Sequence, residues 1–195
     1  MKNILLTLVI AFAAAGVTLS QTGGKSQKRQ PASDGASAVI MTQVPLINEV
    51  RHELLTLPYY GVFDWIDFEV SADGTAVTLN GQVVNPGTKS NAGLLVGKIS
   101  SVTQVNNRIK VLPLSPLDDQ LRKKVFRAIY NFDSPLFRYS IQAVPPIHII
   151  VDRGQVTLKG VVASKGDSNL ANISANGVPG VFKVTNELQV ESGVR

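Results

Sequence analysis

The chain has 195 residues, of which 44% are hydrophobic and 17% are charged, and its formal net charge is +5 at pH 7. This composition supports one or two small packed domains and excludes a wholly disordered chain. The sequence contains no cysteine, which excludes disulfides, thiolate nucleophiles, cysteine-ligated metal centres and an acylated lipoprotein cysteine. Its two histidines, His52 and His148, leave few candidates for histidine-based catalysis.

The start of the chain has the pattern of a secretion signal. Lys2 supplies the positive charge, and the run 4–19 carries no charged residue. That run is shorter than the roughly 20 residues that a membrane-spanning helix needs. We expect residues 1–20 to be a signal peptide cleaved after Ser20, with Gly16 as the second choice of site, and the protein to be periplasmic or secreted. The alternative is an uncleaved membrane anchor.

Residues 21–43 are rich in Gly, Ser, Gln and Ala and show no apolar periodicity until Val39. This composition predicts a flexible linker. Its cations, Lys25, Lys28 and Arg29, either keep the linker solvated or attract it to an anionic surface.

An internal repeat is the most informative feature of the sequence. With an offset of 79 residues, VTLNGQV at 77–83 aligns with VTLKGVV at 156–162. Eleven of the 35 positions in 77–111 are identical in 156–190, without a gap. Apolar residues alternate in both copies, as a half-buried strand requires. The sequence therefore contains one structural unit twice.

We place the first copy at 44–113. The spacing of Leu46, Val50, Leu54 and Leu57 predicts a helix. The predicted elements, in chain order, are a helix that begins at Pro45, strands at 68–70 and 76–84, a helix at about 88–100 and a strand at 105–111.

The second copy, at 114–191, repeats this order and is followed by a tail at 192–195. Ser115 is the expected N-cap of its first helix, with Pro116 at the first helical position. The expected core stripe of that helix consists of Leu117, Leu121, Val125, Ala128, Ile129 and Phe132. The remaining predicted elements are strands at 147–151 and 155–162, a helix at about 167–176 and a strand at 183–190.

The αββαβ order predicts an α+β fold with two tandem domains, each a three-stranded mixed sheet with two helices packed on one face. Because a helix connects the last two strands of each copy, the third strand should run parallel to the second. Gly81 and Gly160 occupy equal places in the second strand, which marks a bulge or the close packing of a helix. Each copy is small for an unstapled core, so we expect the copies to bury surface against each other.

The two copies resemble BON domains (bacterial osmotically induced and nodulation domains). The motif that carries the resemblance is a hairpin, a Gly, a small-residue helix and then Gly-Val-x-x-Val-x-Asn-x-Leu-x-Val. The second copy matches at 180–190, and the first copy matches at 101–111 with Ser101 in place of the Gly. The resemblance implies two tandem BON domains in an exported protein, with no known catalytic residues. It also implies an association with envelope integrity, osmotic stress and phospholipid binding. The lipid anchor of some dual-domain members is not carried over, because there is no cysteine to acylate.

One helix face is a candidate lipid-binding site. A projection at about 100° per residue places cations and aromatic rings together on the outward face of the first helix of copy two. Such a mixture suits an anionic membrane interface, where guanidinium groups meet phosphate and rings lie among headgroups. The alternative is a solvated face with its phenylalanine covered by the other copy. The candidate lipid-binding residues are Arg122, Lys123, Phe126, Arg127 and Tyr130.

A second candidate site is an aromatic run in copy one, between its first helix and first strand. It suggests a surface that contacts a protein partner; the alternative is a lid over the sheet edge of the core. The candidate interaction residues are Tyr59, Tyr60, Phe63 and Trp65.

The rest of the sequence offers no reactive centre. His148 alternates with apolar neighbours and should point to the opposite sheet face from Ile147. His52 lies between Glu49 and Glu53, which we interpret as a surface group and not a metal site. Nucleotide-binding glycine motifs and nucleophile motifs are absent, and neither copy has the strong cationic face of a nucleic-acid binder.

We therefore expect no catalytic residues, no metal, no cofactor and no nucleic-acid partner. The leading hypothesis is a non-enzymatic envelope protein that binds an anionic phospholipid surface. The alternative is a module that binds another envelope protein, and a hydrolase of a periplasmic substrate is a remote third.

Overall fold

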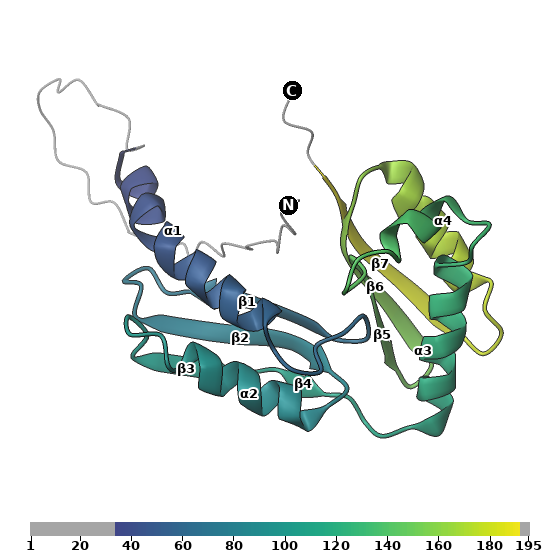
Figure 1. Ribbon diagram of the computed structural model, residues 1–195, viewed down its shortest axis with the longest axis horizontal. Coiled ribbons are helices and arrows are strands. Elements are labelled where there is room, and N and C mark those ends of the chain that lie inside the picture. Colours follow the sequence, from purple (N-terminus) through teal and green to yellow (C-terminus); the bar gives the residue numbers. More distant parts are fainter. Residues whose placement is uncertain (1–33, 192–195) are drawn as a thin grey trace, which may run out of the picture.

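The computed structural model describes residues 34–191, with side chains from Gln43 onward. The first half of this region forms one α+β unit (Figure 1). Its elements are α1 (Asp34–Leu55), β1 (Trp65–Val70), β2 (Ala76–Val83), α2 (Pro86–Val96), β3 (Gln104–Asn107) and β4 (Lys110–Val111). The second half repeats the order, with an added 3-10 helix. Its elements are α3 (Pro116–Ile129), η1 (Pro135–Tyr139), β5 (Ile147–Asp152), β6 (Gln155–Val162), α4 (Lys165–Asn176) and β7 (Lys183–Val190). The predicted α+β fold with a duplicated αββαβ order is confirmed.

The two sheets have the predicted mixed topology. In the first unit, β1 pairs antiparallel with β2, and both β3 and β4 pair parallel with β2. In the second unit, β5 pairs antiparallel with β6, and β7 pairs parallel with β6. The parallel third strand follows from the helical crossover that precedes it.

Each core lies between one sheet face and the two helices of its unit. Along β2 and β6, apolar residues that point into the core alternate with residues that point away from it. The two helices of each unit contact each other, α1 with α2 and α3 with α4. Buried residues of the first core include Val50, Val77, Leu79, Ala92 and Ile109. Those of the second core include Val125, Ile129, Ile149, Leu158 and Ala171.

Gly81 and Gly160 have the same role in the two units. Their φ angles are +126° and +121°, a region that side chains with a Cβ rarely adopt. A Cβ on Gly81 would collide with the carbonyl oxygen of Trp65, and one on Gly160 would collide with that of Pro146. The close approach at each glycine is therefore to the backbone beside it, at Trp65 and Pro146, and not to a helix as expected.

An asparagine ties the last strand of each unit to the preceding helix. The Asn107 amide donates to the carbonyl oxygen of Lys89 in α2 over 2.8 Å, and its own oxygen accepts from the backbone N–H of Ile109. The strand that was predicted over 105–111 is divided at this residue into β3 and β4. Asn186 makes the same bonds to Ser168 and Leu188.

Three expectations about the helices need correction. First, α1 begins at Asp34, with Pro45 inside it, so residues 34–43 are helical where a flexible linker was expected; the alanine, methionine and glutamine of this segment favour a helix. Second, Leu117 is 73% exposed and Phe132 79% exposed, because the buried contacts of α3 run only from Asp118 to Ile129. Leu117 lies in the first turn of α3, ahead of these contacts, and Phe132 lies beyond the end of the helix, where its ring meets that of Phe137 at 5.1 Å.

Third, α2 ends at Val96, earlier than predicted.

The expected signal peptide, the segment 21–33 and the tail 192–195 lie outside the described residues. Within 34–191, no helix has both the length and the apolar character that a membrane crossing requires.

Candidate functional site

The two units contact each other through a loop that runs along the edge of β5. The backbone N–H of Ile149 donates to the carbonyl oxygen of Val62 over 2.8 Å, and Nδ1 of His148 lies 2.6 Å from the carbonyl oxygen of Asp64. The first bond occupies a backbone N–H of β5 that an open edge strand would leave unpaired, and the second is made by a side chain of the same strand. The expectation that the copies bury surface against each other is therefore met in the described residues.

The Asp64 side chain holds this loop in shape. Its carboxylate accepts from the backbone N–H groups of Gly61 at 3.0 Å and Val84 at 2.7 Å. Burial raises the pKa of Asp64, while these two bonds and the nearby Arg122 oppose the rise. Sequence analysis missed this role, and an aspartate three residues after a glycine in a short loop was the available signal.

Three of the four aromatic interaction candidates lie between the units. The Trp65 ring meets the His148 ring edge-on at 5.1 Å, Tyr60 lies 5.7 Å from His148, and Phe63 lies 6.2 Å from Phe126 of α3. Their contacts are therefore within the chain, over the edge of β5.

Tyr59 differs from its aromatic neighbours. It is 79% exposed and has a φ angle of +65°, a left-handed conformation that is uncommon for a residue with a side chain. Among the four interaction candidates, Tyr59 is the one whose ring is open to a partner.

His148 points away from the core of its own unit, as its alternation with Ile147 and Ile149 predicted. It is buried against the first unit together with Ile150, on the outer face of β5. Burial lowers the pKa of His148 to about 4, although its contact with the Asp64 carbonyl favours the charged form. The imidazole is therefore neutral at pH 7, and Nδ1 donates to the carbonyl oxygen of Asp64.

A second contact lies at the other end of β5. Trp65, Leu112 and Ile150 form a small apolar cluster between the units. Beside it, the Lys110 ammonium group pairs with the Asp152 carboxylate at 2.5 Å. The outer faces of the two sheets thus meet through apolar, aromatic and charged groups.

The prediction that Arg122 and Tyr130 face outward from α3 is wrong. Arg122 is only 3% exposed; its guanidinium group donates to the carbonyl oxygen of Val151 at 2.8 Å and pairs with Asp119. The Tyr130 hydroxyl donates to the carbonyl oxygen of Ile147 and accepts from the N–H of that residue. Both side chains turn inward because they satisfy backbone groups of the edge strand β5.

Phe126 is half-buried against Phe63 of the first unit and Tyr130 of its own helix. It is therefore covered by the other unit, which was the alternative interpretation of this helix face. Of the five candidate lipid-binding residues, Lys123 and Arg127 are exposed.

Lys124 completes an exposed group that sequence analysis missed. Lys123, Lys124 and Arg127 point to solvent from one side of α3, and none of them forms an ion pair with the described residues. We call these three residues the cationic face of α3. Their spacing of one, three and four residues was the signal that could have identified the set. Two exposed apolar residues lie before and after it in the chain, Leu117 in the first turn of α3 and Phe132 three residues beyond the end of the helix.

The described residues provide no centre for metal chemistry. Within 34–191, no group of three His, Asp or Glu side chains is placed to hold a metal ion. The densest polar cluster joins Asp167 to Ser164, Tyr139 and Arg138. Ser164 is the N-cap of α4, so this cluster fixes the start of α4 and the loop that carries η1.

The fold defines a class of protein in which one small αββαβ domain occurs twice in tandem. The family model of the BON domain matches residues 49–113 and again residues 118–192. The chain therefore belongs to the BON-domain family and contains two BON domains. BON domains are generally non-catalytic binding domains, and the family is associated with phospholipid binding and with envelope proteins.

Two similar solved structures are of CdsD, a structural protein of the type III secretion system of Chlamydia trachomatis. The C-terminal domain of CdsD is 15% identical with a TM-score of 0.30, over 77% of this chain and 99% of that chain. The second structure is 12% identical with a TM-score of 0.29, over 75% of this chain and 92% of that chain. At these TM-scores neither similarity bears on function. No curated protein matches the chain.

Proposed function

We propose that the protein is a non-enzymatic envelope protein that binds anionic phospholipid surfaces through the cationic face of α3. The observation that carries this proposal is that Lys123, Lys124 and Arg127 are exposed on one side of a well-packed helix without carboxylate partners among the described residues. Membership of a family associated with phospholipid binding supports it. A role in envelope integrity or stress tolerance would follow from such docking.

The flanking residues suit a helix that lies in the plane of a membrane interface. Lys123, Lys124 and Arg127 would meet lipid phosphates, while the exposed side chains of Leu117 and Phe132 would enter the boundary between headgroups and acyl chains. Each cation near an anionic leaflet contributes about 1 kcal/mol. Three cations therefore correspond to roughly a hundredfold in affinity at low salt.

Co-sedimentation with vesicles tests the proposal. The full chain should pellet with vesicles that contain equal parts of phosphatidylglycerol and phosphatidylcholine, and less so as salt is raised. Combined substitution Lys123→Ser, Lys124→Ser and Arg127→Ser should reduce binding by roughly a hundredfold. Unchanged pelleting of this variant would rule the cationic face out.

The matched control removes the same charge elsewhere on the surface. Lys98, Arg108 and Lys165 are exposed and form no ion pair with the described residues, so their combined replacement by Ser should leave most of the binding intact. Both variants keep residues 1–33, so any contribution of that segment is common to them.

The competing hypothesis is a module that binds another envelope protein. The exposed Tyr59 ring, held at positive φ, favours it. Equal binding to neutral and anionic vesicles, or binding to neither, would support this second function over lipid docking.

A further inference from the structure

One end of the second unit carries three large apolar side chains that are open to solvent. Leu114 is 94% exposed in the connector before α3, Leu117 is 73% exposed in the first turn of α3, and Phe182 is 83% exposed just before β7. The starts of α3 and β7 and the turn between β5 and β6 lie at the same end of this unit (Figure 1). Single exposed apolar residues are ordinary, whereas several at one place mark an interaction site. We call these three residues the apolar tip.

Backbone contacts hold the segments of the apolar tip together. The carboxylate of Asp118, next to Leu117, accepts from the backbone N–H groups of Arg153 and Gly154 at 2.9 Å each. The backbone N–H of Phe182 donates to the carbonyl oxygen of Gly154 over 3.0 Å. A Cβ on Gly154 would lie 2.4 Å from the Phe182 ring, so the ring lies against this turn. The same turn therefore anchors both Leu117 and Phe182.

The first unit has no counterpart of the Phe182 ring. With the offset of 79 residues, Phe182 corresponds to Thr103 and Gly154 to Thr75. The Thr103 backbone N–H donates to the carbonyl oxygen of Thr75 over 2.8 Å, which is the same bond as that between Phe182 and Gly154. The fold thus accepts a polar residue at this position. The exposed ring, with a glycine beneath it, belongs to the second unit and is not explained by the packing of the domain.

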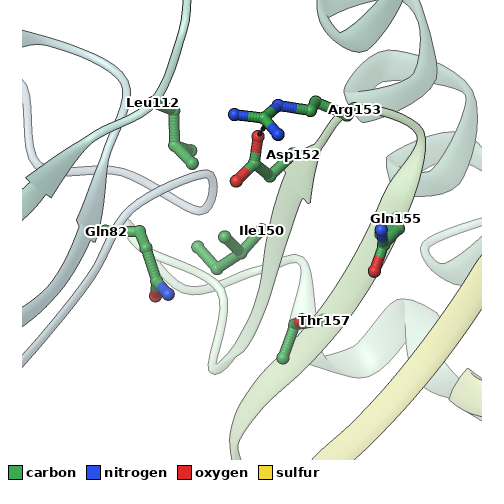
Figure 2. A pocket seen from close by; sticks show the side chains of 7 residues that line it. All are labelled: Gln82, Leu112, Ile150, Asp152, Arg153, Gln155 and Thr157. Atoms are coloured by element: carbon green, nitrogen blue, oxygen red, sulfur yellow. Dashed lines mark ion pairs between the residues drawn. The ribbon is translucent and has the colours of Figure 1, made fainter.

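Cations lie beside the apolar tip. Lys183, the first residue of β7, is exposed and forms no ion pair with the described residues. The Arg153 side chain is 81% exposed, and its Nε lies 3.8 Å from the Asp152 carboxylate (Figure 2), beyond hydrogen-bond distance. The carboxylates of Asp118 and Asp119 at the start of α3 are bonded within the chain. The surroundings of the tip therefore favour anions.

A membrane suits this surface better than a protein partner. Apolar side chains with cations beside them match the boundary between headgroups and acyl chains of an anionic bilayer. Three side chains supply well under the roughly 800 Å² per partner that a stable protein–protein interface buries. The tip is also continuous with the cationic face of α3. Lys124 follows Leu117 by about two helical turns, so both side chains leave the helix on the same side.

We propose that the apolar tip inserts into the anionic bilayer to which the cationic face of α3 docks. This inference rests on the proposed phospholipid function and specifies which end of the second unit enters the membrane. The three apolar side chains enter the region below the headgroups. Arg153 and Lys183 remain at the level of the headgroups and pair with lipid phosphates.

A fluorescent label tests the insertion directly. Because the sequence contains no cysteine, Phe182→Cys gives the full chain a single site for the environment-sensitive dye NBD. The matched control is Thr103→Cys, which labels the equivalent exposed position of the first unit. With vesicles of equal parts phosphatidylglycerol and phosphatidylcholine, NBD at position 182 should brighten several-fold, shift to the blue and be quenched by lipids with a nitroxide on the acyl chain. NBD at position 103 should do none of these.

The outcomes separate the insertion from the docking. If the chain pellets with the vesicles while NBD at position 182 stays in water, the insertion is overturned and the docking stands. If the chain does not pellet, both are overturned. If NBD at position 182 still inserts when the cationic face of α3 is replaced by serines, the tip is supported and the cationic face is not needed.

A variant measures what the ring contributes. Phe182→Ser should weaken binding to these vesicles roughly tenfold, because an aromatic side chain no longer leaves water. Leu94→Ser, a 64% exposed change on α2 of the first unit, is the matched control and should leave binding unchanged. Urea denaturation should show both variants to be as stable as the unchanged chain. Full affinity of Phe182→Ser would overturn the proposal. So would a dimer in lipid-free sedimentation that Phe182→Ser dissociates, because the tip would then bind a second copy.

Discussion

Asn107 and Asn186 show how one side chain can define a fold. Each joins the preceding helix to the last strand, through an amide donated to a helix carbonyl and an oxygen that accepts a strand N–H. The strand N–H belongs to the residue two positions further on, which is Ile109 in the first unit and Leu188 in the second. The motif that carries the family resemblance is therefore structural, and it marks the fold without marking a ligand site.

Gly160 provides a test at the scale of one residue. Gly160→Ala places a Cβ at a φ of +121° and against the carbonyl oxygen of Pro146. Both effects strain the native backbone, so we expect the variant to lose about 2 kcal/mol or more of unfolding free energy. Urea denaturation followed by circular dichroism measures the change.

Gly166→Ala is the matched control for this prediction. Gly166 lies in the first turn of α4, and the nearest atom to an added Cβ is 3.5 Å away. Alanine favours a helix over glycine by about 1 kcal/mol, so this variant should be as stable as the unchanged chain or slightly more stable. A Gly160→Ala variant of equal stability would contradict the inferred collision.

Sequence reasoning at this scale succeeds where the cause is local. Ser115 and Pro116 start α3 as predicted, because an N-cap depends only on its own first turn. Arg122 and Tyr130 were misplaced because the backbone groups that they satisfy belong to β5, 29 and 17 residues further along the chain. A helical projection gives the angle of a side chain but not the partner that a long side chain can reach.

The helix α3 has three faces, and sequence periodicity identifies one of them well. Leu121, Val125 and Ile129 are buried in the core as predicted. A second face, at Phe126, is covered by the first unit, and the third is the cationic face. The boundary between the last two is set by how the units dock, which no pattern within the helix encodes.

Substitutions of apolar residues on and beside α3 test which of them contribute to membrane binding and which to stability. Leu117→Ser combined with Phe132→Ser should weaken binding to anionic vesicles by roughly a hundredfold, because each apolar side chain contributes at least about 1.5 kcal/mol when buried. The same change should alter stability by less than about 0.5 kcal/mol, since both residues are exposed. Vesicle co-sedimentation and urea denaturation give the two readouts.

Two further variants complete this comparison. Ile173→Ser, an exposed change on α4, should affect neither readout. Phe126→Ala should lower stability, because it leaves a void beside Phe63. If vesicle binding survives the loss of Leu117 and Phe132, the ends of α3 do not enter the membrane, and docking rests on charge alone.

In the whole molecule, the two units share the same fold and core but differ in the residues on the outer faces of their sheets. In the pairing of β5 with β6, Ile147 lies opposite Gly160, and in the pairing of β1 with β2, Ile66 lies opposite Gly81. His148 and Ile150 of β5 thus correspond to Asp67 and Glu69 of β1. The outer face of β5 can be buried against the first unit, whereas the charged outer face of β1 cannot receive a further unit in the same way. The sequence repeat predicted the fold of each unit, and the substitutions between its copies, which have no periodicity, determine how the units pair.

His148 makes this pairing sensitive to pH. Its pKa is lowered by burial to about 4, against about 6.5 in an unfolded chain. Between these values the unfolded chain binds a proton that the folded chain does not, so stability falls as the pH is lowered from 6.5 to 4. The expected loss is on the order of 3 kcal/mol. Below pH 4 this contribution is constant.

The groups around His148 determine how this prediction is tested. Lys159 is its cross-strand neighbour and would repel a protonated ring, whereas the raised pKa of Asp64 favours the folded state in acid and partly masks the effect. Urea denaturation at several pH values should therefore compare the unchanged chain with His148→Gln, which keeps a side-chain donor but does not titrate. The difference in unfolding free energy between the two should narrow or reverse as the pH falls from 7 to 4. A difference independent of pH would show that the imidazole is not buried between the domains.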